Sequence, residues 1–290
     1  MRRPSWLLFS LLLLVAVGCQ NSAAKAERPN RTKVYKSIVS LSPGTTEIIA
    51  IGADASILKG RTQACNWPTG VTSVPVVASV KPDYEKLQEI KPDLIIYDAA
   101  LYSEADVQKL KQTTNAEMFA ISANTIADFT KQLHELGAMV ASEIRMNDQV
   151  TKIHGERNDS TGASAAAPKV AVLLPGEGTG DMIAGTGSFV ADAVRVAGGE
   201  PVGPDAEIFV KSSPEALISL NPDIIVVPGT KENIKGAMSI LQNPQYRTLN
   251  AVKNRKVRVL NGDVLLRRGG RVDQLLTGLR RSIYGEEGGA

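Results

Sequence analysis

Histidine and cysteine are scarce in this sequence, and their scarcity excludes several kinds of site. The histidines are His134 and His154, and the cysteines are Cys19 and Cys65. The histidines lie 20 residues apart in one predicted helix, which turns them to opposite sides, so they cannot share a metal ion. Cys19 ends a predicted leader, which leaves Cys65 alone and excludes an intramolecular disulfide. We expect no metal site, and we expect Cys65 to be a buried, small apolar side chain.

Motifs that carry catalysis are also absent. The sequence contains no H-E-x-x-H, G-x-S-x-G or C-x-x-C pattern, so metalloprotease, hydrolase and thiol-redox activities lack their base or nucleophile. Two glycine-rich stretches, 175–181 and 185–188, do not match G-x-G-x-x-G, and no G-K-[ST] P-loop occurs. Each stretch is interpreted either as a turn lining a ligand cleft or as a plain surface loop. These absences favour a binding protein over an enzyme, and we predict no catalytic residue and no cofactor.

No excess of charge points to nucleic acid. Removal of a leader that contains two arginines leaves 33 − 2 = 31 basic residues against 30 acidic ones. A nearly neutral chain gives no electrostatic reason to bind DNA or RNA. Residues 250–282 are locally basic, with nine Lys or Arg against Asp263 and Asp273, and they form either a solvated face or a wall that faces an anion.

The N-terminal apolar run is too short to span a membrane. Residues 6–17 follow two arginines and are almost wholly apolar, but these twelve residues fall short of the roughly 20 that a hydrocarbon core requires. Residues 1–18 are therefore predicted to be a signal peptide. The following junction, A-V-G-C, resembles the bacterial lipobox, which implies lipidation at Cys19 and an exported protein anchored on the periplasmic or cell-surface side; an ordinary signal peptide is the alternative. Residues 19–33 are predicted to be a polar tether.

A long amphipathic segment occupies the middle of the chain. From residue 124 to residue 159 the apolar residues recur mostly every three or four positions, which is typical of one face of an α-helix. No proline interrupts the pattern, and Asn124 or Thr125 can cap its start. We predict one long helix of about 50 Å over 124–159 that connects two parts of the chain. The apolar stripe comprises Ile126, Phe129, Leu133, Leu136, Val140, Ile144, Val150 and Ile153.

The segments on either side of this helix repeat each other. Residues 83–96 and 213–226 both contain a Glu, a Leu two residues later and a Pro-Asp pair that opens an apolar run, at a constant offset of 215 − 85 = 130. Around each segment, short β-rich runs alternate with amphipathic helices, as in parallel α/β folds. We predict an α/β protein with two lobes, 34–123 and 168–290, joined by a single long helix.

Ligands of parallel α/β sheets bind outside the carboxyl ends of the strands. Two lobes on one connector face each other across a cleft, so the loops that follow the strands are the expected ligand site. These predicted loops are 41–45, 61–70, 78–82, 98–102, 175–188, 208–213, 228–230 and 261–271.

Glu85 and Glu215 occupy the same position of the repeat. Each lies in the first turn of a predicted helix, where free N–H groups and the helix dipole favour a carboxylate. A capping role explains one such Glu well, but it explains less well why both lobes keep it at the same position. We interpret the two acids as a docking face for basic sockets on a partner.

Several motifs occur in the order found in one known family. The motifs are 38–47 (I-V-S-L-S-P-G-T-T-E), 65–68 (C-N-W-P), 84–87 with 91–93, 187–189 with 197–199, and 267–271 (R-R-G-G-R). From residue 34 to residue 283 the chain resembles the periplasmic binding proteins of ABC importers for cobalamin, haem and ferric siderophores. The resemblance implies two Rossmann-like lobes joined by one long helix, a small-molecule metal chelate as ligand, and an ABC permease that docks on Glu85 and Glu215. A monomer is expected.

Among the subtypes of this family, the chain resembles the cobalamin-binding proteins most. Trp67 and Phe209, from opposite lobes, match aromatic residues of their cleft, and Asp263 and Arg267 match polar residues near the corrin. If the two aromatic side chains face each other, a ligand between them buries both rings. The resemblance implies these ligand-binding residues: Ser42, Pro43, Trp67, Ser79, Tyr97, Asp98, Phe209, Asp263, Arg267 and Arg271.

The ligand also has alternatives within the family. Ser79, Asp98 and Val264 stand where the best-known cobalamin binder has tryptophans, and Ala78 stands where haem-binding members have an iron-ligating tyrosine. For a ferric siderophore, Arg267 and Arg271 are candidate partners of its anionic groups. We therefore expect a corrinoid first and a siderophore or haem as alternatives, with an enzyme that uses the cleft as a weaker hypothesis.

Overall fold

The computed structural model describes residues 33–79, 81–158, 166–176 and 180–285. The predicted signal peptide, the lipidation site Cys19 and nearly all of the tether lie outside the described residues. From Lys33 onward the described residues belong to one compact unit. None of their helices is long and apolar enough to cross a membrane.

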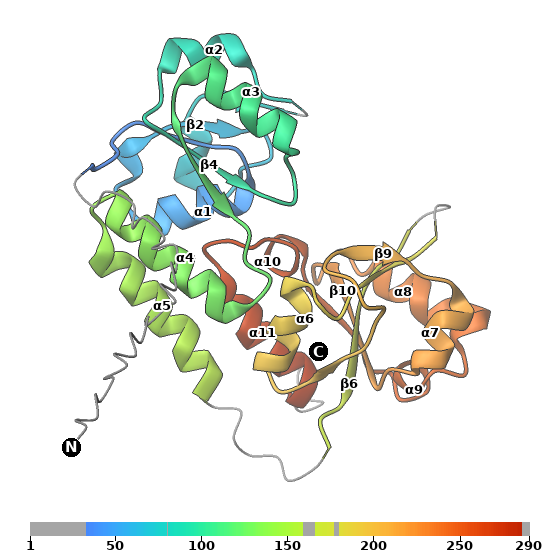
Figure 1. The fold of residues 1–290 in the computed structure, drawn as a ribbon. Coiled ribbons are helices and arrows are strands. Elements are labelled where there is room, and N and C mark those ends of the chain that lie inside the picture. The colour runs from blue at the N-terminus through green and yellow to red at the C-terminus, as the bar shows by residue number, and fades with distance from the viewer. Residues whose placement is uncertain (1–32, 80, 159–165, 177–179, 286–290) are drawn as a thin grey trace, which may run out of the picture. The chain divides into compact units, whose positions relative to one another are not determined.

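The first lobe is built on a parallel sheet, as its alternating pattern predicts. In the described part of the chain the sheet has five strands in the order β3-β2-β1-β4-β5 (Figure 1). Strand order reverses between β1 and β4, and ligands of open α/β sheets bind at such a switch point. The elements are β1 (Ile38–Ser40), α1 (Pro43–Gly52), η1 (Ala55–Ile57), β2 (Leu58–Thr62), η2 (Thr69–Ser73), β3 (Val76–Ala78), α2 (Tyr84–Ile90), β4 (Leu94–Asp98), α3 (Glu104–Thr114) and β5 (Glu117–Ile121).

The second lobe has a mixed sheet. Its described strands follow the order β11-β10-β6-β7-β9, with β8 also paired to β6; β7 and β9 run antiparallel to their neighbours. The sequence predicted β6, β10 and β11 but not β7, β8 or β9, because runs of two or three residues are too short to show a period. The elements are β6 (Lys169–Leu174), β7 (Met182–Ala184), α6 (Phe189–Val196), β8 (Glu200–Pro201), β9 (Phe209–Lys211), α7 (Pro214–Leu220), β10 (Ile224–Gly229), α8 (Lys235–Gln242), η3 (Pro244–Tyr246), α9 (Asn250–Lys253), β11 (Val257–Asn261), α10 (Gly262–Leu265) and α11 (Val272–Tyr284).

The connector consists of two helices, so the prediction of a single long helix is wrong. Helix α4 (Ile126–Met139) is followed by a turn in which Ala141 has a left-handed φ of 51°, and α5 (Glu143–Asn158) then begins. The N–H of Ser142 donates to the carbonyl of Gly137 at 2.8 Å, which closes the helix end in the manner of a Schellman motif. The two helices pack side by side (Figure 1).

The apolar spacing gives no sign of this turn, because Ile144 continues the stripe predicted for a single helix. In the structure Ile144 is 78% exposed, whereas Met146, which the stripe omits, is buried. A Cβ at Gly137 would lie 3.1 Å from the Cβ of Met146, so α4 and α5 approach closely at this point. The apolar pattern therefore restarts out of phase after the turn.

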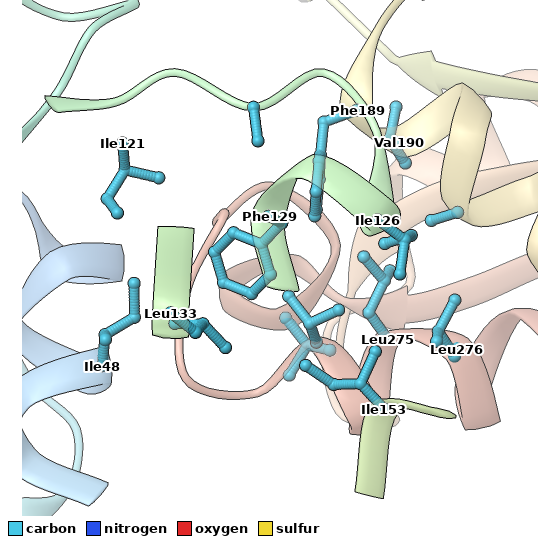
Figure 2. Packing of buried hydrophobic residues seen from close by; sticks show 14 of the residues in the cluster. Ile48, Ile121, Ile126, Phe129, Leu133, Ile153, Phe189, Val190, Leu275 and Leu276 are labelled. Carbon is cyan, nitrogen blue, oxygen red and sulfur yellow. The ribbon is translucent and has the colours of Figure 1, made fainter. Parts of the chain in front are cut away.

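One hydrophobic core runs through both lobes and the connector. Phe129 of α4 is fully buried, and its ring meets that of Phe189 of α6 edge-on at a centroid distance of 5.5 Å. Figure 2 shows that the same cluster includes Ile48 and Ile121 from the first lobe and Leu275 from the second. The lobes therefore share packed side chains and do not meet through an open hinge.

Candidate functional site

A cavity of 590 Å³ lies between residues of the two lobes. Its first-lobe wall comes from the loops after β1, β4 and β5, two of which flank the switch point of the first sheet. Its second-lobe wall comes from the start of α6, the beginning of β9 and the residues around the end of α10. The lining residues are Ser42, Pro43, Gly44, Asp98, Ala99, Ala100, Leu101, Ser122, Asn124, Ser188, Phe189, Val190, Glu207, Ile208, Phe209, Leu265, Leu266, Arg267 and Arg268.

Apolar side chains that face solvent gather at this cavity. Leu101, Ile208 and Leu266 are 62%, 62% and 47% exposed, and all of them line it. They come from separate segments, after β4, before β9 and after α10, and Phe209 of β9 adds a partly buried ring. A ligand with an apolar face would remove this surface from water, which is favourable at about 25 cal/mol per Å².

Two helices begin at the cavity, one from each lobe. Ser42 caps α1, because its Oγ accepts the N–H of Thr45 at 3.1 Å, and Pro43 occupies the first turn. Ser188 caps α6 in the same way, with the N–H of Ala191 at 3.4 Å. The remaining free N–H groups of each first turn are potential donors to ligand oxygens.

Arginines of the second lobe enclose a buried carboxylate of the first. Glu47 of α1 is 1% exposed and accepts hydrogen bonds from Arg271 Nη2 at 2.6 Å, Arg271 Nε at 3.1 Å and Arg267 Nη1 at 3.0 Å. A buried acid is tolerated when it is paired in this charge-assisted way. Asp263 also binds Arg267, at 2.6 Å, and accepts the amide of Asn66 from the first lobe at 2.9 Å. This network joins the lobes beside the cavity.

The loop that carries these arginines approaches the first lobe closely because it contains glycine. A Cβ at Gly269 would lie 2.9 Å from the Cα of Gly44, and a Cβ at Gly270 would lie 2.8 Å from the carbonyl oxygen of Glu47. In return, a Cβ at Gly44 would lie 2.7 Å from the carbonyl oxygen of Arg268. Backbone meets backbone here, so a side chain at any of these glycines would push the lobes apart.

A second network links the lobes at the cavity itself. Arg268 pairs with Asp98 of the first lobe and also donates to the carbonyl of Ala123 at 3.0 Å and to Asn124 Oδ1 at 3.3 Å. The amide of Asn124 in turn donates to Glu207 Oε2 of the second lobe at 3.0 Å. Sequence reasoning missed Arg268, Asn124 and Glu207 as cavity residues. The available signal was the place of Arg268 within R-R-G-G-R.

The structure divides the residues predicted to bind ligand into two sets. In the described lining, Ser42, Pro43, Asp98, Phe209 and Arg267 are present, and Trp67, Ser79, Tyr97, Asp263 and Arg271 are not. Trp67 and Phe209 are therefore not brought together at the cavity. The ring of Trp67 instead covers the guanidinium of Arg271 at 4.9 Å, on the side chain that also binds Glu47. The ligand-binding role of each residue remains a prediction.

Glu85 and Glu215 lie exposed in the first turns of α2 and α7, and neither belongs to the cavity lining. Other residues cap these helices: Asp83 Oδ1 and Ser213 Oγ each accept the backbone N–H three residues on, both at 3.2 Å. The pKa of Glu215 is lowered by its own backbone N–H and by the hydroxyl of Ser213. The N-cap hydrogen bonds of the two helices therefore do not require either Glu.

The described residues contain no group of three or more His, Cys, Asp and Glu side chains that could hold a metal ion. Cys65 is buried, as expected for a lone small apolar side chain. Within the described lining, no His, Tyr, Met or Cys occurs. Haem iron takes its axial ligands from such side chains, whereas a chelate with a complete coordination sphere needs none.

Comparison with known proteins identifies the family. The family model described as periplasmic binding protein matches residues 38–264. The chain belongs to this family, as its motifs indicate. Two relatives are named for transport, one as an ABC transporter substrate-binding lipoprotein and the other as a protein of a heme uptake system.

The relatives cover nearly the whole chain at low identity. The chain is 24% identical to the uncharacterised ABC transporter substrate-binding lipoprotein YvrC of Bacillus subtilis, over 98% of this chain and 97% of that protein. It is 23% identical to the high-affinity heme uptake system protein IsdE of Staphylococcus aureus, over 84% and 85% respectively. The structure of the periplasmic vitamin B12 binding protein BtuF of Vibrio cholerae matches with a TM-score of 0.72 at 20% identity, over 86% of this chain and 96% of that one. The last likeness establishes the two-lobed fold.

Proposed function

We propose that this protein is a lipid-anchored substrate-binding protein that captures a corrinoid between its lobes and delivers it to an ABC permease. The observation that supports the ligand class is the group of exposed apolar side chains, Leu101, Ile208 and Leu266, in a cavity whose arginines are already paired. A corrinoid is a large neutral or weakly charged chelate with an extensive apolar face, so it can cover these side chains without requiring a free cation.

Haem is the first alternative, because the relative IsdE is named for heme uptake. The described lining offers haem iron no His, Tyr, Met or Cys. A ferric siderophore is the second alternative, and it needs no ligand from the protein. The siderophores with net negative charge would need arginines, and both Arg267 and Arg268 already bind carboxylates.

The proposed partners are a membrane and a permease. The N-terminal sequence supports the first, and the internal repeat supports the second. The A-V-G-C junction and the lipoprotein name of the relative YvrC support an anchor at Cys19 on the outer side of a membrane. Glu85 and Glu215, exposed and outside the cavity lining, support docking to basic sockets of a permease. No catalytic residue takes part in this function, and the protein acts as a monomer.

Calorimetric titration with cyanocobalamin, dicyanocobinamide, haemin and a neutral ferric hydroxamate tests the ligand class. We expect the corrinoids to bind most tightly. Ile208→Ser should weaken corrinoid binding about tenfold, because burial of such a side chain contributes about 1.5 to 3 kcal/mol. Ile234→Ser is a matched control, since Ile234 is also exposed and apolar but does not line the cavity. Tightest binding of haemin, or equal effects of the two substitutions, would contradict the proposal.

A further inference from the structure

The described lining of the cavity contains equal numbers of acidic and basic side chains, but not all of them form ion pairs. The described lining contains Arg267, Arg268, Asp98 and Glu207. Arg267 donates to Glu47, Asn66 and Asp263 at 3.0, 2.8 and 2.6 Å. Its charge is therefore opposed by carboxylates that are not themselves part of the lining.

Arg268 is also held by hydrogen bonds to protein groups. All of its nitrogens donate to protein oxygens: Nη2 and Nε to Asp98, and Nη1 to the Ala123 carbonyl and to Asn124. A guanidinium has five N–H donors in one plane, and these contacts use four of them. A ligand anion would therefore find one remaining Nη2 donor, beside the carboxylate of Asp98. Neither arginine thus offers the ligand an uncompensated positive charge.

Glu207 is different, because its carboxylate binds an amide and not a cation. Its side chain is exposed at the cavity, and its partner is the neutral amide of Asn124 at 3.0 Å. Within the described part of the chain, Glu207 forms no ion pair. The described lining therefore presents one carboxylate that is held by an amide hydrogen bond and forms no ion pair.

We propose that this cavity selects against anionic chelates, and that Glu207 determines this preference while Asp98 keeps Arg268 from reversing it. The inference rests on the proposed corrinoid function and narrows it to neutral or cationic members of that class. Two like charges about 6 Å apart in water-like surroundings repel each other enough to weaken binding on the order of threefold for each ligand carboxylate. Salt should reduce the effect, since the Debye length is about 10 Å at 0.1 M ionic strength.

Glu207 could instead serve only to orient Asn124 across the lobes. Glu207→Gln separates the two roles, because the glutamine carbonyl can still accept the Asn124 amide while the charge is lost. The matched control is Asp205→Asn, which removes an exposed carboxylate two residues away that does not line the cavity.

The test uses one scaffold that differs in charge: cyanocobalamin and its tricarboxylate derivative, in which three side-chain amides are hydrolysed. We expect the wild-type protein to bind cyanocobalamin much more tightly. Glu207→Gln should raise the affinity for the tricarboxylate, relative to that for cyanocobalamin, by about threefold to tenfold at low salt and by less at high salt, since each ligand charge within about 6 Å contributes about threefold. Asp205→Asn should change this ratio by less than about twofold.

The remaining outcomes contradict either the role of Glu207 or the proposed function. Equal wild-type affinity for both ligands, an unchanged tricarboxylate affinity in Glu207→Gln, or the same gain in Asp205→Asn would overturn the assignment to Glu207 and leave the corrinoid function standing. Failure of the wild-type protein to bind cyanocobalamin at all would overturn the proposed function, and the charge preference with it.

Discussion

Helix α2 of the first lobe and helix α7 of the second have the same seven-residue length and the same kind of ends. Each begins with a side-chain N-cap, Asp83 or Ser213, and each ends on a left-handed residue, Lys91 with φ of 48° or Asn221 with φ of 41°. Positions that fix the backbone are therefore equivalent in the two lobes, although the residue types differ.

The Asp that lies three residues after each helix makes the same kind of contact in both lobes. Asp93 Oδ2 accepts the N–H groups of Lys36 and Ser37, both at 3.2 Å, and Asp223 Oδ2 accepts the N–H of Lys169 at 3.0 Å. Each Asp thus ties the start of the next strand to the strand beside it. The Asp of the repeated Pro-Asp pair is explained by this bond.

The solvent-facing positions of the two helices differ. At the equivalent exposed positions α2 has Glu85, Lys86, Gln88 and Glu89, and α7 has Glu215, Ala216, Ile218 and Ser219. Only the Glu is kept. The N-cap hydrogen bonds come from Asp83 and Ser213, so capping alone does not require this Glu, and its exposure in both lobes is compatible with docking.

Removal of the buried Leu of each helix should have the largest effect on stability. Leu87 and Leu217 are fully buried in separate parts of the core. We expect Leu87→Ala and Leu217→Ala each to lower the free energy of unfolding by about 2 to 5 kcal/mol, because each deletes buried methyl groups and leaves a cavity. Urea unfolding measures both, with the exposed Ile218→Ala as a control of about 0.5 kcal/mol or less. A cost below 1 kcal/mol in one lobe alone would show that the repeat is not energetically equivalent.

Replacement of the Asp that ties the strands should lower the free energy of unfolding by a smaller amount. Asp93→Ala leaves two backbone N–H groups without their acceptor, and Asp223→Ala leaves one backbone N–H and the side-chain amide of Asn250, so the two substitutions should cost about the same. Each lost hydrogen bond contributes about 0.5 to 1.5 kcal/mol. Urea unfolding again provides the measurement. A clearly smaller cost of Asp93→Ala would mean that water replaces the carboxylate at Lys36 and Ser37.

The comparison also shows what the sequence can and cannot predict. The repeat and the parallel strands were predictable, because burial repeats with the period of each element. The connector was not, since Ile144 continues the helical spacing although the chain turns at Ala141, a residue that seldom adopts positive φ. A local exception that is stabilised by contact with Met146 of the next helix leaves no periodic signal.

The site was predictable at the level of loops and less so at the level of side chains. The loops after β1 and β4 do line the cavity, as strand-exit loops of an open sheet should. Which arginine faces the cavity depends on how 267–271 meets the first lobe. Arg271 turns to Glu47 and Trp67, and Arg268 turns to Asp98, a difference that only tertiary packing decides.

Removal of the Glu that both lobes share should weaken docking to a permease, and this effect should be smaller. Glu85→Ala and Glu215→Ala should each weaken docking by about 0.2 to 1 kcal/mol, the range for exposed ion pairs, and the double variant should lose the most. Binding to the permease in nanodiscs at low and high salt measures this loss, which salt should diminish. Ligand affinity in solution is the control and should not change. Normal docking by the double variant would leave the conserved spacing without a role in delivery.

The smallest expected effect concerns the left-handed residues, and its sign should differ between the lobes. At Lys91 a side chain opposes the left-handed conformation, so Lys91→Gly should raise the free energy of unfolding by about 0.5 kcal/mol. Asn221 tolerates this conformation better, and its Oδ1 accepts the N–H of Asn250 at 3.0 Å.

Asn221→Gly removes that acceptor and should therefore lower the free energy of unfolding by about 0.5 to 1 kcal/mol. The pair is compared by urea unfolding of both variants and of Lys91→Asn, which should fall between the wild-type protein and Lys91→Gly. Opposite signs would mean that the same backbone turn has been stabilised by different means in the two lobes. Gains of equal size in both would show that the Asn221 side chain contributes nothing beyond its tolerance of positive φ.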